Sequence, residues 1–305
     1  MELLIRDLAK TYGNGVRALD RISLTIPTGM FGLLGPNGAG KSTLMRTLAT
    51  LQDADAGSAL LKGLPGGDID VLRDKDAVRQ VLGYLPQDFG VYAKVSAQDL
   101  LDHFARLKGL VDAPARRQTV DALLHRVNLH AVRKQHLGGF SGGMRQRFGI
   151  AQALLCDPKL VIVDEPTAGL DPEERVRFHN LLADIASDVI VILSTHIVSD
   201  VSDLCARMAI IDRGRLLLTG DPVALTAALD GRVWQKSIAR AELDAVKAAH
   251  PVISSRLLAG RTLVNVVADA APGDGFVPIA PTLEDVYFHA IGESRQSAAA
   301  VAGVA

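Results

Sequence analysis

A glycine-rich segment, residues 35–42, constrains the fold of this chain more than any other feature of its sequence. It matches the phosphate-loop pattern Gly-x-x-x-x-Gly-Lys-Ser/Thr with Gly35, Pro36, Asn37, Gly38, Ala39, Gly40, Lys41 and Ser42. The segment lies between a predicted strand, Met30–Leu34, and a predicted helix, Thr43–Leu51, which is the context the motif requires. In such a loop, backbone N–H groups surround the phosphates while the lysine and the serine hydroxyl reach the terminal phosphates and Mg²⁺. The sequence therefore predicts an α/β fold that binds a nucleoside triphosphate.

Two carboxylates end a second apolar segment. Leu160–Val163 reads as a buried parallel strand, and Asp164 and Glu165 follow it directly. Parallel strands deliver such residues to the carboxyl edge of the sheet, where ligands bind. We expect Asp164 to hold Mg²⁺ and Glu165 to act as the general base toward water. A buried strand with a solvated acidic end is the alternative, and the phosphate loop in the same chain argues against it.

Two further polar residues follow predicted strands of the same sheet. Gln87 comes after Val81–Pro86, and His196 comes after Val189–Ser194. A glutamine amide suits Mg²⁺ or the attacking water, and a histidine can hydrogen-bond the γ phosphate or the water. Each residue alone is weak evidence for a nucleotide site. A lone histidine at a strand end, for example, is more often structural.

A second phosphate-binding helix start is predicted far from the first, within Phe140–Arg147. Ser141, Gly142 and Gly143 form a small, polar turn that leads directly into a helix. Such a start presents free backbone N–H groups and the positive end of the helix dipole. One chain with two separate phosphate-binding helix starts needs an explanation.

The order and spacing of these motifs resemble the ATP-binding subunit of ABC transporters over roughly residues 2–220. The resemblance implies a P-loop NTPase core that binds ATP and Mg²⁺ and has a helical signature subdomain. It also implies roles for further residues. Tyr12 would stack on adenine, Thr43 would join the phosphate loop in binding nucleotide, and Gly169–Asp171 would form the D-loop, with Asp171 as its site residue. Gln87 would be the Q-loop residue, with Ser42 and Asp164 as fellow Mg²⁺ ligands, and His196 would be the switch histidine.

The signature segment departs from the common Leu-Ser-Gly-Gly-Gln at both ends, where Phe140 and Met144 stand. We expect these changes to alter helix packing more than phosphate contact. Met144 and the segment Pro281–Tyr287 resemble the ABC-2 export subfamily, which includes the daunorubicin-resistance type ATPases. The resemblance therefore favours export as the direction of transport.

The resemblance also explains the two helix starts. The phosphate loop of one copy and Ser141–Gly143 of another would sandwich one ATP, so a homodimer or pseudo-dimer would bind two. A separate integral membrane permease would be the other partner, which places the chain at the cytoplasmic face of the cell membrane. Residues 88–92 are the expected contact with the permease; packing inside the helical insert is an equal alternative for their aromatic side chains.

Charge and length agree with that interpretation. The net charge is −1 in 305 residues, so no nucleic-acid partner is expected. The apolar runs are far shorter than the ~18 residues of a membrane span, and the N-terminus does not resemble a signal peptide. Cys156 and Cys205 are too few for a disulfide framework, and we expect both to be reduced.

Domain organisation follows from the changing patterns along the chain. We expect an ATP-binding domain at 1–221, a helical subdomain at about 88–155, a small α+β region at 222–293 and a disordered tail at 294–305. The ATP-binding domain should include an antiparallel β subdomain, with strands at 2–8 and 16–28. Thr282 and Asp285 form a possible capping box before a final helix.

Seven histidines outside the site lack metal-ligand spacing in the sequence and are expected to be ordinary surface or core residues: His103, His125, His130, His136, His179, His250 and His289. Two other functions also remain open. A non-transport ABC ATPase acting on ribosomes or DNA is disfavoured by the single nucleotide domain, the lack of coiled-coil heptads and the near-neutral charge. A nucleotide binder without turnover is disfavoured by the presence of Glu165 and His196.

Overall fold

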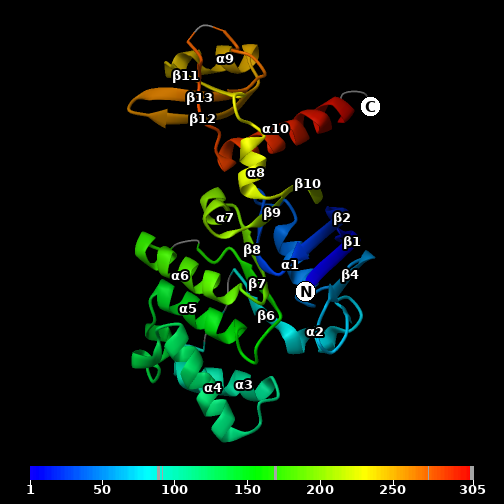
Figure 1. Ribbon diagram of the computed structural model, residues 1–305, viewed down its shortest axis with the longest axis vertical. Helices are drawn as coiled ribbons and strands as arrows, with labels where there is room; N and C mark the ends of the chain where they lie inside the picture. The colour runs from blue at the N-terminus through cyan, green and yellow to red at the C-terminus, as the bar shows by residue number, and fades with distance from the viewer. Residues whose placement is uncertain (88–89, 91, 168–169, 274, 303–305) are drawn as a thin grey trace.

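The computed structural model describes residues 1–87, 90, 92–167, 170–273 and 275–302, and of 297–302 the backbone alone. Three β-sheets organise this part of the chain (Figure 1). The six-stranded sheet lies at the centre, the first antiparallel sheet lies beside it, and the third sheet lies at the opposite end of the molecule from α3 and α4.

The central sheet has the strand order β10-β9-β3-β8-β7-β6. Its strands are β3 (Gly29–Leu34), β6 (Leu82–Leu85), β7 (Leu160–Asp164), β8 (Ile190–Thr195), β9 (Arg207–Asp212) and β10 (Arg215–Gly220). All neighbouring pairs are parallel except β9 and β10, which form an antiparallel hairpin. The carboxyl ends of β3, β8, β7 and β6 therefore meet at one edge of the sheet.

Both faces of the inner strands β3, β7 and β8 are buried, which explains their continuous apolar runs. Along β7, Leu160 and Ile162 pack into one core cluster, and Val161 and Val163 pack into another. The first cluster contains the apolar face of α1 (Lys41–Leu48) and the antiparallel sheet. The second contains residues of α5 (Gly142–Ala153), α6 (Pro172–Ile185) and α7 (Val198–Leu204).

The predicted antiparallel β subdomain is present as a sheet of order β2-β1-β4-β5. Its strands are β1 (Glu2–Thr11), β2 (Arg17–Pro27), β4 (Ala56–Lys62) and β5 (Ile69–Asp70), and α2 (Lys75–Val81) follows. The helix expected at Thr43–Leu51 begins and ends earlier in the structure, since α1 runs from Lys41 to Leu48. Leu51, the last residue of the expected helix, is 63% exposed.

A helical region follows β6, as predicted. It contains α3 (Ala97–Leu107), α4 (Ala113–Arg126) and α5, with the short 3₁₀ helices η1 (His130–Val132) and η2 (Leu137–Gly139) between α4 and α5. Ser96 caps α3 through a hydrogen bond from the Asp99 amide, and Asp112 caps α4 in the same way. Helix α3 packs on both α4 and α5, so the three helices share one core.

The C-terminal part contains a four-stranded sheet of order β12-β13-β11-β14. Its elements are α8 (Pro222–Ala227), β11 (Val233–Ile238), η3 (Arg240–Glu242), α9 (Leu243–Ala249), β12 (Val252–Leu258), β13 (Arg261–Val267), β14 (Val277–Pro278) and α10 (Leu283–Ala302). These elements have the mixed α+β character expected for residues 222–293. Trp234 packs against a small core beside β13, and its indole N–H donates to the Ala268 carbonyl.

Helix α10 joins this part to the ATP-binding core. Its start has the predicted capping box, because the Asp285 amide donates to the Thr282 hydroxyl while Asp285 accepts from the Thr282 amide. We expected a disordered tail from residue 294, whereas helix α10 continues to Ala302 in the structure. At residue 294 the helix is held to the central sheet, because the Ser294 hydroxyl donates to the buried carboxylate of Asp212 at the end of β9.

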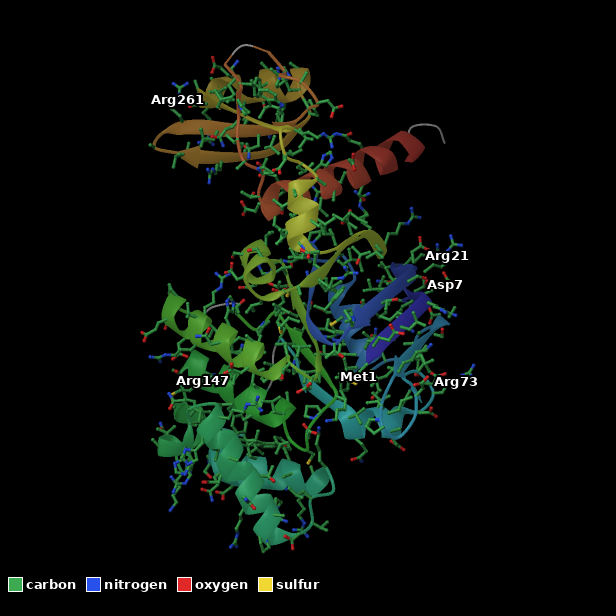
Figure 2. The ribbon with its side chains drawn as sticks, in the orientation of Figure 1. Met1, Asp7, Arg21, Arg73, Arg147 and Arg261 are labelled. Atoms are coloured by element: carbon green, nitrogen blue, oxygen red, sulfur yellow. The ribbon has the colours of Figure 1, made fainter. Side chains whose placement is uncertain are left out.

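Side chains fill the space between these layers (Figure 2). Cys156 and Cys205 are both free, and burial raises the pKa of the Cys205 thiol to about 12. Within the described ranges, no helix combines the length and the apolar character needed to cross a membrane.

Candidate functional site

The sheet topology brings most of the predicted site together. Strand β8 lies between β3 and β7, so the phosphate loop after β3, the carboxylates at the end of β7 and His196 after β8 share one edge. Gln87 follows β6, the neighbour of β7, and its side chain is exposed. Parallel pairing is therefore the reason why residues more than 100 positions apart form one site.

The phosphate loop encloses the ammonium group of Lys41. Nζ donates to the Gly35 carbonyl at 2.7 Å and to the Pro36 carbonyl at 3.2 Å, and the residue is 4% exposed. Gly40 has φ 107°, and a Cβ there would lie 2.3 Å from the Ala18 carbonyl oxygen. Only glycine fits such a position. The loop thus forms a cation-centred cradle at the N-terminus of α1.

Glu165 lies between a cation and an imidazole. Its Oε1 is 3.5 Å from Lys41 Nζ, and its Oε2 is hydrogen-bonded to His196 Nδ1 at 2.5 Å. The backbone of Glu165 is left-handed, with φ 51°, and its amide donates to the Ser194 carbonyl at 2.8 Å. Strained non-glycine backbone concentrates at functional positions. The Glu165 side chain is 5% exposed and that of His196 is 48% exposed, so the imidazole connects the buried carboxylate to solvent.

Asp164 is suited to a cation. It is 3% exposed, and within the described part of the chain its Oδ1 has no hydrogen-bond partner. Burial raises the pKa of Asp164, and the hydroxyls of Ser194 and Ser42 offset part of that rise. A divalent ion would satisfy the unpaired oxygen and favour the ionised form.

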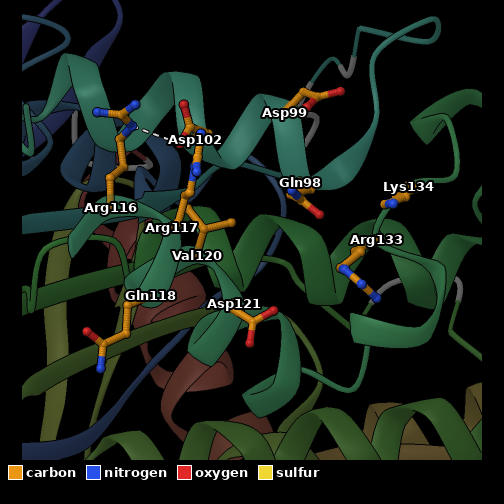
Figure 3. Close-up of a pocket in the computed structure, with 10 residues that line it drawn as sticks. All are labelled: Gln98, Asp99, Asp102, Arg116, Arg117, Gln118, Val120, Asp121, Arg133 and Lys134. Carbon is orange, nitrogen blue, oxygen red and sulfur yellow. Dashed lines mark hydrogen bonds and ion pairs between the residues drawn. The ribbon is translucent and has the colours of Figure 1, made fainter. Parts of the chain in front are cut away.

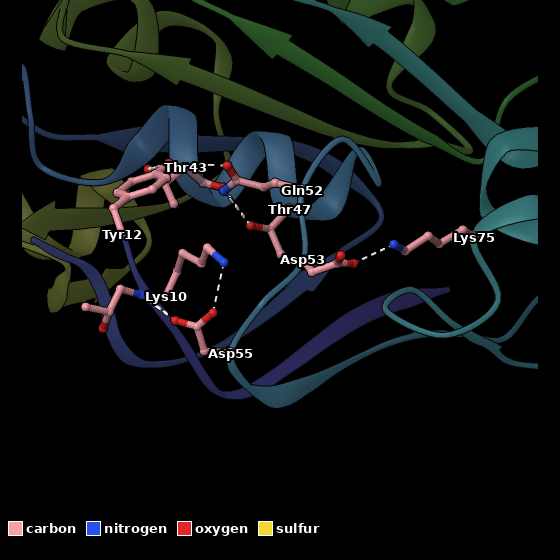
Figure 4. Close-up of polar contacts among 9 residues, drawn as sticks. Lys10, Tyr12, Thr43, Thr47, Gln52, Asp53, Asp55 and Lys75 are labelled. Atoms are coloured by element: carbon pink, nitrogen blue, oxygen red, sulfur yellow. Dashed lines mark hydrogen bonds and ion pairs between the residues drawn. The ribbon is translucent and has the colours of Figure 1, made fainter. Parts of the chain in front are cut away.

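Tyr12 is held beside the start of α1 by its hydroxyl group (Figure 4). The hydroxyl oxygen is 3.1 Å from Thr43 Oγ1 and 3.2 Å from Gln52 Oε1. Gln52 in turn donates to the Thr43 carbonyl and the Thr47 hydroxyl. The residue remains 38% exposed, so a fixed aromatic ring is available next to the phosphate loop. Sequence reasoning missed Gln52, which follows α1 and has no local pattern to mark it.

The second helix start lies on α5, away from these contacts. Ser141 caps α5 by accepting from the Met144 amide at 3.2 Å, and both Ser141 and Gly142 are exposed. Gly143 is different, because a Cβ there would lie 2.5 Å from Glu174 Oε2. Arg147 holds that carboxylate through an ion pair of 3.3 Å.

The altered ends of the signature segment both face the protein core. Phe140 is 3% exposed, and Met144 packs against the same core cluster. These positions agree with the expectation that the two departures act on packing.

Other predicted positions lie partly outside the described residues. Asp171 caps α6 by accepting from the Glu174 amide at 2.9 Å. Gly169, the other end of the predicted D-loop, lies outside the described residues. So do residues 88–89 and 91 of the predicted permease contact.

Comparison with known proteins decides the family. The model of the family described as "ABC transporter" matches residues 19–168. The daunorubicin/doxorubicin resistance ATP-binding protein DrrA of Streptomyces peucetius is 34% identical over 267 residues, which cover 87% of this chain and 77% of DrrA. This chain belongs to the ABC transporter family. Its predicted family and fold are thereby confirmed.

Other relatives agree. The probable multidrug ABC transporter ATP-binding protein YbhF of Escherichia coli (strain K12) is 37% identical over 216 residues, or 70% of this chain. The match spans only 36% of YbhF. A solved structure titled "Structure of ATP binding subunit of ABC transporter" is 26% identical, has a TM-score of 0.65 and covers 75% of this chain and 93% of its own. The structure of cbiO1 from Clostridium perfringens is 28% identical with a TM-score of 0.64, covering 74% of this chain and 90% of its own.

Sequence reasoning missed one buried carboxylate that connects the elements next to the site. Asp200 on α7 is fully buried and accepts hydrogen bonds from the Thr167 hydroxyl and from Arg175. His179 Nε2 also lies 2.9 Å from it. Asp200 therefore ties the segment after Glu165 to α6 and α7. A polar residue inside the short helix after His196 was the only available signal.

The ABC fold also has a cavity of about 810 Å³ between α3 and α4 (Figure 3). Its lining is mostly charged and includes Asp102 and Arg116, whose side chains form an ion pair of 2.8 Å. None of the predicted site residues lines this cavity. The predicted nucleotide-binding residues lie instead at the carboxyl edge of the central sheet.

Proposed function

We propose that this chain binds and hydrolyses ATP to energise transport through a separate membrane-spanning partner. The observation that carries the proposal is the placement of Glu165 between Lys41 and His196. Lys41 would bind the β and γ phosphates, and Glu165 would take the proton of the attacking water. His196, hydrogen-bonded to Glu165, would hold the γ phosphate or the water in line.

The nucleotide would lie along the phosphate loop and Tyr12. Backbone amides of residues 35–43 would surround the phosphates at the N-terminus of α1, and adenine would stack on the Tyr12 ring. The two hydrogen bonds that fix the Tyr12 hydroxyl favour this role, because they orient the ring before nucleotide binds.

Mg²⁺ would be held by oxygen ligands of Ser42, Gln87 and Asp164. The unpaired Oδ1 of Asp164 supports this assignment. When bound, the ion would neutralise negative charge on the phosphate oxygens. The residues would contribute by orienting the ion at the end of β7, next to the general base.

Two ATP-binding subunits, identical or related, would complete each site. The exposed Ser141, together with the amides of Gly142 and Gly143, would contact the γ phosphate held by the phosphate loop of the other subunit, with Asp171 beside the interface. The exposure of Ser141 and Gly142 favours this arrangement, because the start of α5 is open to a partner.

The transport role rests on the family and on the names of its relatives. DrrA and YbhF are named for drug resistance and multidrug transport, and Met144 and the Pro281–Tyr287 segment resemble the same export subfamily. We propose export through an integral membrane permease, with the chain at the cytoplasmic face of the membrane. The helical subdomain at about 88–155 would dock the permease. Residues 1–221 would form the ATP-binding domain, and 222–293 an accessory region.

The substitution Glu165→Gln tests the proposal. It keeps the side-chain shape but removes the base, so we expect turnover to fall by about 10²–10⁴-fold while ATP is still bound. Steady-state phosphate release and ATP-dependent dimerisation would be measured on the same preparation. Glu173→Gln is the matched control, because Glu173 is exposed on α6 and contacts Arg177. Wild-type turnover in the Glu165→Gln protein would refute the assignment of the base.

A further inference from the structure

Three side chains with metal-ligand chemistry meet at the junction of α4 and η1. They are Asp121, His125 and His130, and one ligand atom from each lies within 4.8 Å of the others. The expectation that these histidines are ordinary surface or core residues relied on linear spacing. The fold adds what linear spacing could not show, because it brings the three residues together.

Local geometry explains the meeting. Asp121 and His125 are four residues apart on α4 and therefore share one helix face. Asn128 has φ 55°, and this left-handed residue turns the chain so that η1 returns toward α4. The imidazole rings of His125 and His130 consequently stack, with centroids 3.6 Å apart.

Both imidazoles direct the same ring nitrogen at one carboxylate. His130 Nε2 is 2.9 Å from Asp121 Oδ1, and His125 Nε2 is 3.7 Å from Asp121 Oδ2. Tetrahedral zinc ligands with bonds of about 2.0–2.1 Å are about 3.3 Å apart. The two observed separations bracket that value. Because the stacked rings are nearly parallel, with 17° between their planes, the imidazoles would have to rotate apart until both Nε2 atoms point at one ion.

The ligand set and its exposure select the class of ion. Two imidazole nitrogens and one carboxylate oxygen suit Zn²⁺ and similar transition metals, whereas Mg²⁺ and Ca²⁺ prefer oxygen ligands alone. The Asp121 and His125 side chains are more than half exposed, and Asp121 also lines the cavity between α3 and α4 (Figure 3). A hydrated ion can therefore reach the cluster, and water can supply a fourth ligand.

We propose that Asp121, His125 and His130 bind a divalent transition-metal ion of the zinc class, which clamps η1 to the end of α4. The proposal does not depend on ATP hydrolysis, because the site is built entirely within the helical region. An ordinary hydrogen bond between His130 and Asp121 that stabilises the turn is the competing explanation, and it predicts no metal binding.

The experiment titrates Zn²⁺ against a chromophoric chelator with the untagged, nucleotide-free full chain. We expect one Zn²⁺ per chain at this site. Removal of an outer partner of a metal ligand costs about 10–100-fold in metal affinity. His125→Ala and His130→Ala each remove a ligand itself, so each should weaken Zn²⁺ binding by at least that factor. The matched control is the double variant His103→Ala/His136→Ala, which changes two exposed histidines elsewhere in the helical region and should leave the affinity unchanged.

Two further readouts separate metal binding from folding. Zn²⁺ should raise the Tm of the wild type and of the control but not that of His125→Ala/His130→Ala, and each protein is also melted without metal. A large excess of Mg²⁺ should not displace the Zn²⁺. Equal Zn²⁺ affinity in the wild type and in His125→Ala/His130→Ala would overturn the proposal, as would displacement by Mg²⁺.

Discussion

The helices α1 and α5 both begin in glycine-containing turns, yet their surroundings differ. The start of α1 encloses the ammonium of Lys41, which is hydrogen-bonded to the loop and faces Glu165. The start of α5 is open, with Ser141 and Gly142 exposed, and the nearby cation Arg147 is paired with Glu174.

From this difference we expect the start of α1 to bind phosphate by itself and the start of α5 not to do so. A buried cation with surrounding amides supplies strong, charge-assisted hydrogen bonds. An exposed helix N-terminus contributes only about 0.3–1 kcal/mol to holding an anion. The start of α5 is therefore suited to detect a phosphate that another element already holds, which is the role proposed for it in a dimer.

Mixing two inactive variants gives the largest expected effect. Ser141→Asp keeps the cap of α5, because Asp is a preferred N-cap residue, but places a negative charge against phosphate. Lys41→Met removes the cation from the phosphate loop. We expect each variant alone to be inactive and the mixture to recover about a quarter of the wild-type rate, because half the dimers contain one intact site of two. Activity of Ser141→Asp alone would contradict completion of the site by a second copy.

The affinity of a single subunit for ATP tests the same difference between the starts of α1 and α5. Truncating a buried, hydrogen-bonded charge costs about 2–5 kcal/mol, so Lys41→Met should weaken ATP binding by about 30-fold or more. Arg145→Met changes an exposed cation in the first turns of α5 and should leave binding nearly unchanged. Calorimetric titration at a concentration too low for dimerisation measures both. Equal losses in the two variants would mean that α5 takes part in the first binding step.

The sequence was sufficient for the parts of the site that local patterns encode. The phosphate loop has a fixed spacing, and Asp164, Glu165 and His196 each follow an apolar strand. Once those strands are taken as parallel neighbours, their carboxyl ends must meet. The central fold and the meeting of these residues could therefore be predicted without a structure.

Contacts between distant segments could not be predicted in this way. Asp200 receives hydrogen bonds from Thr167 and Arg175, and Ser294 reaches Asp212 across 82 positions. No periodic pattern encodes such pairs, because each depends on how whole elements pack. The extension of α10 and the meeting of His125 with His130 were missed for the same reason.

The start of α1 should also show a pH-dependent effect on the stability of the fold. Burial raises the pKa of Asp164, which lies beside the start of α1. At pH values between the ordinary pKa of about 3.9 and this raised pKa, the native state binds more protons than the unfolded state. The free energy of unfolding then falls as pH rises through that window. Asp164→Asn should therefore be more stable than the wild type at pH 7 without Mg²⁺ and nucleotide, and this advantage should shrink on acidification.

Urea unfolding at several pH values checks this prediction, with Asp53→Asn as a control of opposite sign. The Lys75 ammonium hydrogen-bonded to Asp53 lowers the pKa of that carboxyl, so its removal should not stabilise the protein. A lower stability of Asp164→Asn than of the wild type at pH 7 would show that the carboxylate contributes to folding. Loss of Mg²⁺-dependent turnover in the same variant is expected in either case.

The smallest expected effect is a difference in stability between alanine variants of two adjacent glycines at the start of α5. Among the described residues, nothing lies within 4 Å of a Cβ built at Gly142, so Gly142→Ala should stabilise the fold by about 0.4–1 kcal/mol through the unfolded state. A Cβ at Gly143 meets the Glu174 side chain, which Arg147 holds, so Gly143→Ala should cost about 1–3 kcal/mol by overpacking. The midpoints of urea unfolding measure both values. Equal and small changes would mean that Glu174 moves aside freely, and the second glycine would then be needed for phosphate contact alone, as the motif by itself suggests.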